Sequence, residues 1–530
     1  MRHLTKVVGL IVALTLAIVP GALAGGVLNI HSDVEVISLD STIATDGFSF
    51  TVMAQFTEPL YILDAAGTPI LGAAESVAKS EDGLTYTFTL RDTTWSNGDP
   101  VTAYDFEFAW RHLVDPANAS EYNYIMGIAG VKNATEVMNG ELPLEDLGCK
   151  ALDDKTFEVT LSIPVPYFES LMAFPSFFPI NQAFFEACGE NYGTSSDTVL
   201  SNGPFMISAY EPAALTIELV KNPGYWNADS VSLDGLTFKV IKDAQQAMLV
   251  YDAGELDVAI LTGEQIELYQ DEPDFTVIPE GYLWFITDNQ LKPELANLNI
   301  RKALATSFDK DAIVNQILKD GSIAADFAVP KGFATGPDGT DFRDGTPTYL
   351  ACDKAKALEY WNAGLAELGV ESMTLSLIVE DADPSPRIGE FLQSEWQSTL
   401  PGLTIELQVM PKKSRLQYIR ERDYDLSLTR WGPDYADPMT YLDLWTTEES
   451  AQEWSNAEYD AIIESAKTGE LALDYTARWA ALKDAEAIFM NDAGIFPVYQ
   501  KGAVRMIKPN VVGIEYHAVG NTLFKNVTKD

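Results

Sequence analysis

An acidic residue in an irregular, aromatic segment is the clearest candidate for chemistry in the sequence. Asp434 stands within Trp431–Pro438, where two prolines exclude a helix and Gly432 loosens the turn. The preceding run, Tyr424–Thr429, alternates in the pattern of a strand. We therefore expect a carboxylate displayed just past a strand end, where α/β proteins usually present binding groups. A solvated acidic surface turn fits the same residues.

Motifs of the common enzyme classes are absent from the sequence. It contains no G-x-S-x-G, P-loop, Rossmann glycine fingerprint or H-E-x-x-H. Beyond the first 24 residues the histidines are His31, His112 and His517, too far apart to predict a metal site. With 78 Asp and Glu residues, a pair of carboxylates proves nothing, so a two-acid hydrolase stays open. We expect no enzyme, no metal and no cofactor.

The three cysteines are Cys149, Cys188 and Cys352, so at least one thiol is free. In an exported protein a Cys149–Cys188 disulfide is permitted, and free buried thiols fit equally well. No C-x-x-C spacing occurs, so neither a zinc motif nor a redox motif is predicted.

Residues 1–24 have the pattern of a signal peptide. Two basic residues precede an apolar run, Val7–Val19, and Ala22–Ala24 is a small-x-small cleavage site. The run is short for a membrane span, and no cysteine follows it to carry a lipid anchor. We expect an exported protein that begins near Gly25 and works in the periplasm or at the extracellular face of the cell envelope.

The formal net charge of −43 argues against nucleic acid and anionic lipid as partners. A solvated acidic surface explains most of this charge. The 530 residues are enough for two or three lobes with sizeable cores.

The second half of the chain has β-α-β-α-β order. Strand patterns at Met373–Val379, Leu403–Val409 and Tyr424–Thr429 are separated by helical patterns. This order predicts an α/β fold with a mostly parallel sheet, which binds ligands beyond the carboxyl ends of its strands. Other expected elements are a strand at Leu84–Leu90, a helix that Thr102 caps, and helices at Thr51–Leu60 and Tyr475–Met490.

Short motifs occur in order along nearly all of residues 28 to 520. They include Asp82–Arg91, Trp95–Gly98, Pro100–Phe106, Asn202–Phe205, Lys221–Trp226, Gly254–Asp257, Asn299–Ala303 and Asp434-Tyr435. In number and order they resemble those of extracellular solute-binding protein family 5, which includes the oligopeptide-binding proteins of peptide ABC transporters.

The resemblance implies a two-lobed periplasmic-binding-protein fold of type II, similar to cluster C, with an extra α/β domain and a hinge between lobes. The chain would cross between the lobes near residues 284 and 499. The implied divisions are 1–24, signal peptide; 25–57, 182–284 and 500–530, lobe I; 58–181, extra domain; and 285–499, lobe III.

The resemblance also implies a function and a set of binding residues. A monomeric protein would hold a short peptide as an extended strand between closing lobes and pass it to a membrane permease, with no role for nucleic acid. Asp434 matches the acid that pairs with the peptide's α-ammonium group. The flanking matches are Trp431 and Gly432, the segment along the peptide is Asp46, Gly47 and Phe48, and the aromatic near the first peptide residues is Tyr122.

Arg430 departs from the family pattern, since many relatives have glycine before this tryptophan. Its guanidinium could pair with Asp434 or Asp437, or reach a peptide carboxylate. A solvent-exposed arginine fits the sequence equally well.

Other functions remain open on sequence alone. An oligosaccharide-binding protein of the same fold is the main alternative, because Trp431, Tyr435, Trp284 and Phe285 could stack on sugars. For Trp284 and Phe285 we expect core packing instead. The scarcity of histidines disfavours nickel or haem ligands. A secreted peptidase or glycosidase and a peptide sensor without transport are the remaining classes.

Overall fold

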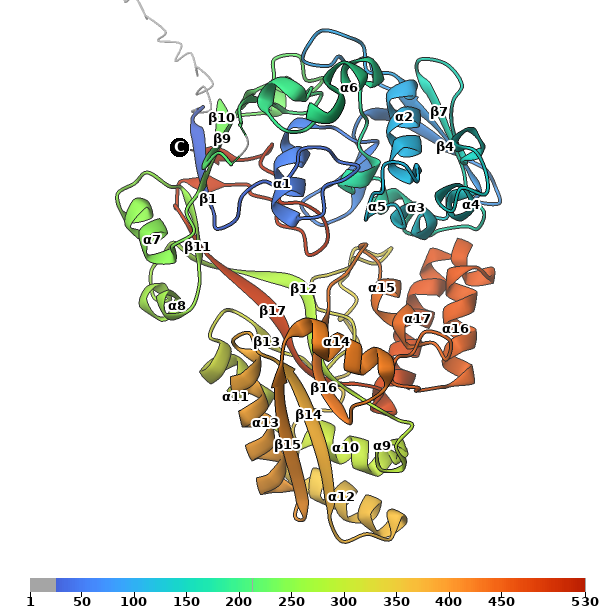
Figure 1. Cartoon of the computed structure of the whole chain (residues 1–530), viewed down its shortest axis with the longest axis vertical. Helices are drawn as coiled ribbons and strands as arrows, with labels where there is room; N and C mark the ends of the chain where they lie inside the picture. The colour runs from blue at the N-terminus through green and yellow to red at the C-terminus, as the bar shows by residue number, and fades with distance from the viewer. Residues whose placement is uncertain (1–24, 212, 530) are drawn as a thin grey trace, which may run out of the picture.

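The computed structural model describes residues 25–211 and 213–529. The predicted signal peptide lies outside these residues. Within them, no helix combines the length and apolar character needed to span a membrane. The chain folds into an upper body with β1, β8–β10 and α1–α6, and a lower body with β14–β16 and α9–α17 (Figure 1).

A single sheet of eleven strands runs through both bodies. Its order is β15 (Leu403–Met410), β14 (Met373–Glu380), β16 (Leu426–Trp431), β12 (Phe275–Asp288), β17 (Phe496–Ile507), β11 (Val258–Leu261), β1 (Val27–Ser32), β10 (Gly235–Val240), β9 (Thr216–Lys221) and β8 (Phe205–Ala209), with β13 (Ile323–Ala324) beside β17.

The prediction of a mostly parallel sheet is wrong for the sheet as a whole. Parallel pairing is confined to β15-β14-β16 and to β11-β1-β10. The long strands β12 and β17 pair antiparallel with each other and with their other neighbours. The predicted β-α-β-α-β order describes the first group correctly. The sequence pattern did not predict that β12 and β17, which are far apart in the chain, join the two parallel groups into one mixed sheet.

Strands β12 and β17 connect the two bodies (Figure 1). Their pairing breaks between Pro279 and Leu283, which leaves residues 280–282 as a bulge in β12. Residues 284 and 499, the predicted crossings, lie on these two strands. We call residues 280–282 the hinge bulge. The lobe boundaries drawn from the sequence remain predictions.

A second sheet supports the outer part of the upper body. Its order is β4 (Ala74–Lys79), β5 (Thr85–Leu90), β7 (Thr156–Thr160) and β6 (Cys149–Ala151), and α2 (Ala103–Val114) packs on it. Tyr86, Phe88 and Leu90 are buried, as the predicted alternation requires. The Thr102 N–H donates to the Asp105 carboxylate at 2.8 Å, so a capping box starts α2.

The remaining helices lie around these sheets. They are α1 (Gly47–Phe56), α3 (Ile125–Ile128), α4 (Ala134–Met138), α5 (Phe168–Leu171), α6 (Gln182–Cys188), α7 (Ala244–Asp252), α8 (Glu264–Tyr269), α9 (Pro293–Ala296), α10 (Leu298–Thr306), α11 (Lys310–Ala312), α12 (Lys354–Leu368), α13 (Ser385–Thr399), α14 (Lys412–Glu421), α15 (Met439–Leu442), α16 (Ala457–Lys467) and α17 (Tyr475–Asn491). Two short strand pairs, β2 (Tyr61–Leu63) with β3 (Pro69–Leu71) and β18 (Val511–Val512) with β19 (Thr528–Lys529), complete the fold.

Helix α1 begins four residues earlier than predicted. The sequence predicted a helix over Thr51–Leu60, whereas the structure has Gly47–Phe56. The Asp46 carboxylate accepts a hydrogen bond from the Ser49 N–H at 2.8 Å, so Asp46 is the N-cap. Thr57 is already extended, which ends the helix before Pro59.

Candidate functional site

The Asp434 loop, residues 432–438, follows strand β16 directly, as predicted. All four residues Leu426–Thr429 are buried, because β16 lies between β14 and β12 and is covered on both faces. The loop then leads into α15. The Asp434 N–H donates to the Thr440 hydroxyl at 3.1 Å, and Thr440 is buried on α15. A rigid strand and a helix therefore fix the position of Asp434.

The Asp434 carboxylate is half-buried, and none of residues 25–211 and 213–529 supplies it with a counter-charge. Burial raises its pKa above the ordinary value of an aspartate. No ion pair or hydrogen bond to this carboxylate occurs among the residues that the structure describes. A partly desolvated carboxylate is stabilised by a cation, so the site is suited to an ammonium group supplied by a ligand.

Two tyrosines of the upper body lie within electrostatic reach of Asp434. Burial and then the Asp434 charge raise the pKa of Tyr124 to about 12. The same two causes raise the pKa of Tyr122, which also interacts with Tyr282. Tyr124 and Tyr282 are each more than two-fifths exposed, at 43% and 46%. Sequence reasoning found Tyr122 and missed Tyr124 and Tyr282, for which no motif gave a signal.

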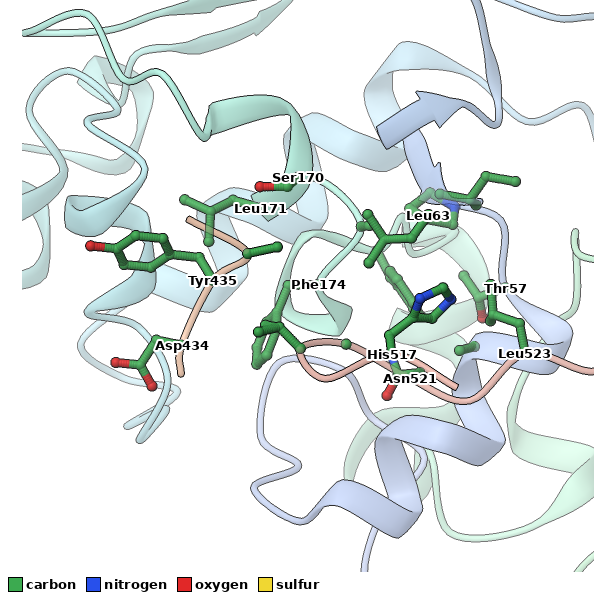
Figure 2. Close-up of a pocket in the computed structure, with 18 residues that line it drawn as sticks. Thr57, Leu63, Ser170, Leu171, Phe174, Asp434, Tyr435, His517, Asn521 and Leu523 are labelled. Atoms are coloured by element: carbon green, nitrogen blue, oxygen red, sulfur yellow. The ribbon is translucent and has the colours of Figure 1, made fainter. Parts of the chain in front are cut away.

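A small cavity of about 40 Å³ adjoins the Asp434 loop. Figure 2 shows Asp434 and Tyr435 at one end and His517, Thr57 and Leu523 at the other, with Phe174 between them. The carboxylate points away from the cavity interior (Figure 2). This volume holds a water molecule or a small apolar group, and not a whole ligand.

Tyr435 joins the two bodies beside Asp434. Its ring stacks on Tyr167 of the upper body with centroids 4.0 Å apart and an interplanar angle of 13°. Tyr435 is only 7% exposed. The residue that follows the candidate acid is therefore occupied by a contact within the protein.

Comparison with known proteins places this architecture in a family. A family model described as bacterial extracellular solute-binding proteins, family 5 Middle, matches residues 68–453. The dipeptide-binding protein of Lactococcus lactis subsp. cremoris is 36% identical over 92% of this chain and 91% of its own length.

The chain belongs to the bacterial extracellular solute-binding proteins of family 5.

Two solved structures resemble the whole of this family 5 protein. Listeria monocytogenes OppA bound to peptide is 35% identical and gives a TM-score of 0.70 over 95% of this chain and 99% of that chain. The unliganded open form of MppA, a periplasmic murein tripeptide-binding protein, is 26% identical and gives a TM-score of 0.83 over 96% and 98%. The expectation of a two-lobed type II binding-protein fold is confirmed.

The predicted binding residues of this family 5 protein come from the start of helix α1, from the segment before α3, and from the end of strand β16 with the loop that follows it. Asp46, Gly47 and Phe48 start helix α1, with Asp46 engaged as its cap. The Phe50 ring of α1 meets Tyr122 edge-on at 5.5 Å, which places α1 beside the tyrosines. Phe48 packs edge-on against Phe238 at 5.6 Å, inside the upper body.

Trp431 and Gly432 lie against strand β12. Trp431 is opposite Leu283 in the β12-β16 ladder. A side chain at Gly432 would place its Cβ 2.2 Å from Cε1 of Tyr282, so glycine lets the Tyr282 ring lie on the loop backbone. Trp431 is therefore held in the ladder with β12, and Gly432 leaves room for the Tyr282 ring against the loop backbone.

Arg430 pairs with neither Asp434 nor Asp437. It donates to both carboxylate oxygens of Glu380, at 3.0 and 3.2 Å, and its guanidinium lies 4.7 Å from the ring centre of Trp284. Arg415 donates to the same carboxylate at 2.9 Å. Burial raises the pKa of Glu380, but hydrogen bonds from the two arginines outweigh it and hold that pKa below its ordinary value.

Asp437 has a different partner, because Arg478 of α17 donates two hydrogen bonds to it, at 2.7 and 2.8 Å. The two side chains are 2% and 0% exposed. This bidentate pair ties the Asp434 loop to the lower body.

Of the remaining candidate groups, His31 holds neighbouring backbone and two aromatic rings pack in the core. His31 accepts from the Ile260 N–H at 3.1 Å and donates to the Ile241 carbonyl at 2.8 Å. The described residues contain no group of three or more side chains that could hold a metal ion. All three cysteines are free, so Cys149 and Cys188 are not bridged. Trp284 and Phe285 are 7% and 4% exposed, which confirms core packing.

Proposed function

We propose that this family 5 protein captures short peptides outside the cytoplasm and delivers them to the permease of an ABC importer. The half-buried Asp434 carboxylate supports this proposal, because it has no cationic partner among the described residues. The α-ammonium group of a peptide supplies that partner. The binding cycle involves no chemical step.

Peptide binding to relatives supports the proposed ligand class. The matched relatives include a dipeptide-binding protein and an OppA bound to peptide. The oligosaccharide alternative is weaker, because Tyr435 stacks on Tyr167 while Trp284 and Phe285 are buried. Of the four rings considered for sugar stacking, only Trp431 is not fully buried, and it too packs against the hydrophobic core.

We further propose that the described arrangement is the open, ligand-free state. The TM-score is 0.83 with the open form of MppA and 0.70 with peptide-bound OppA. Closure would bend β12 and β17 near the hinge bulge and bring Tyr122 and Tyr124 onto the ligand. Domain limits at 57/58, 181/182, 284/285 and 499/500 and a signal peptide at 1–24 are part of this proposal.

Calorimetric titration tests the proposal. We expect a free tri- to hexapeptide to bind at one site, with a negative heat-capacity change from burial of apolar surface. Maltotriose and other short oligosaccharides should give no heat of binding. Saturable sugar binding without peptide binding would replace the proposed function with the alternative.

We assign Arg430 to the carboxylate end of the ligand. Arg415 and Arg430 share the single Glu380 carboxylate, which leaves one surplus positive charge, and the Arg430 side chain is 26% exposed. A ligand carboxylate there forms a charge-assisted hydrogen bond.

Replacing Arg430 tests this assignment. Arg430→Ala should weaken short peptides with a free C-terminus about tenfold, the effect of one charge-assisted hydrogen bond, and leave their C-terminal amides unchanged. The control is Arg387→Ala, which removes an exposed arginine paired with Asp383. Equal weakening of acids and amides would show that Arg430 acts only through the fold.

A further inference from the structure

The Asp434 loop and helix α15 are attached directly to the hinge bulge. Tyr441 of α15 donates its hydroxyl to the carbonyl oxygen of Gly281, in the middle of the bulge. Tyr441 is 1% exposed, and burial raises the pKa of its hydroxyl far above its ordinary value. The hydroxyl is therefore a permanent donor, and its acceptor belongs to the strand that connects the two bodies.

Close backbone packing reinforces this hydrogen bond. A Cβ at Gly281 would lie 2.7 Å from Cγ of Pro433 in the Asp434 loop and 2.9 Å from the carbonyl oxygen of Ala518. In return, the Tyr282 ring of the bulge lies against the backbone of Gly432. One glycine on each segment thus permits an interlocked contact between the loop and the bulge.

The opposite side of the bulge is held by strand β17. The Gln500 amide donates to the carbonyl oxygens of Glu280 and Lys331, both at 2.9 Å. Its own oxygen accepts from the Lys331 N–H at 2.9 Å, and the side chain is 1% exposed. The bulge is therefore fixed between β17 and the loop that carries Asp434.

We propose that Tyr441 is a positioning residue that couples ammonium binding at Asp434 to closure at the hinge. Because Tyr441 ties the loop to the bulge, Asp434 keeps its position relative to the hinge as the bodies rotate. A ligand drives closure only to the extent that it binds the closed state more tightly than the open state. The hydrogen bond from Tyr441 to Gly281 transmits this difference in binding free energy from the Asp434 loop to the hinge bulge. The inference rests on the proposed peptide-binding function.

A matched pair of variants separates coupling from stability. Tyr441→Phe removes only the hydroxyl that reaches Gly281. Tyr459→Phe removes a similar buried hydroxyl, which donates to the carbonyl oxygen of Leu442. Leu442 is the last residue of α15 and does not belong to the hinge bulge. Both variants lose one buried tyrosine-carbonyl hydrogen bond, so their thermal stability should fall by similar amounts.

The readouts are peptide affinity by calorimetry and the compaction that peptide induces, measured by small-angle X-ray scattering. Tyr441→Phe should bind a free-amine tripeptide about fivefold more weakly, the effect of one hydrogen bond, with reduced compaction at saturation. Its affinity for the N-acetylated peptide should match wild type. Tyr459→Phe should match wild type in both affinity and compaction.

Two negative results are distinguishable. If wild type binds and compacts, but Tyr441→Phe behaves like Tyr459→Phe, the coupling role of Tyr441 is overturned and the proposed function stands. If wild type binds no peptide at all, the proposed function falls and this inference falls with it.

Discussion

Asp434→Asn should weaken binding of free-amine peptides by about 100-fold. The substitution keeps the shape of the side chain and removes the charge that pairs with the ammonium group. Loss of one member of a desolvated pair costs on the order of 3 kcal/mol, which corresponds to at least two orders of magnitude in affinity. N-acetylated peptides carry no ammonium group, so their affinity should stay the same or rise slightly.

The matched control for this prediction is Glu121→Gln. Glu121 is exposed beside Tyr122 and is one of the charges that raise the pKa of that tyrosine. The variant changes the net charge by the same amount near the site, and we expect less than a twofold effect on affinity, as for a screened surface charge. Equal weakening of free and acetylated peptides by Asp434→Asn would remove Asp434 from its assigned role.

The expected pairing of the Asp434 carboxylate with the peptide ammonium group also predicts that peptide affinity depends on pH. Only the ionised Asp434 carboxylate attracts an ammonium group, and burial raises its pKa in the free protein. Affinity for free-amine peptides should therefore be constant at neutral pH and fall as the pH decreases through this raised pKa. In Asp434→Asn this decrease should be absent, which calorimetry at several pH values will check.

Asp437→Asn should destabilise the protein by about 3–5 kcal/mol, the cost of breaking a buried ion pair. Arg478 is 0% exposed and donates to both oxygens of Asp437, so the variant leaves a buried guanidinium without its counter-charge. The Asp437 carboxylate also accepts from the Met439 N–H at 2.9 Å, which starts α15. The loop should loosen together with the lower body, and peptide affinity should fall as well.

Urea unfolding and hydrogen exchange of the loop amides measure this effect. The control is Asp443→Asn, which breaks an ion pair with Lys467 whose side chains are 26% and 37% exposed. An exposed pair of this kind contributes less than about 1 kcal/mol. If Asp437→Asn and Asp443→Asn cost the same, the Arg478–Asp437 pair does not hold the loop.

Local patterns in the sequence predicted the local parts of the site. Alternation in Tyr424–Thr429 and the prolines after it located Asp434 on irregular backbone past a strand end, where the structure has it. Alternation around Tyr86 and Phe88 likewise predicted β5. These features depend on neighbours within a few residues, so period and turn chemistry are enough to find them.

Periodicity and turn chemistry could not predict contacts between segments that are far apart in the sequence. The partner of Arg430 is Glu380, at the end of β14 and 50 residues away, whereas the sequence left Asp434, Asp437, a peptide carboxylate and solvent all open for this arginine. Pairing of β12 with β17 joins segments more than 200 residues apart and gives the sheet its mixed character. Tyr124 lies near Asp434, and Tyr282 near Tyr122, only because the fold brings three segments together.

Capture of short peptides by this protein can be tested by native mass spectrometry of the protein as purified, before and after gentle unfolding to release bound molecules. We expect a spread of released masses that match peptides of a few residues, or an empty protein that takes up one added tri- to hexapeptide per chain. A single sugar mass, or no uptake of any peptide, would contradict this expectation and leave the Asp434 carboxylate without its ammonium partner.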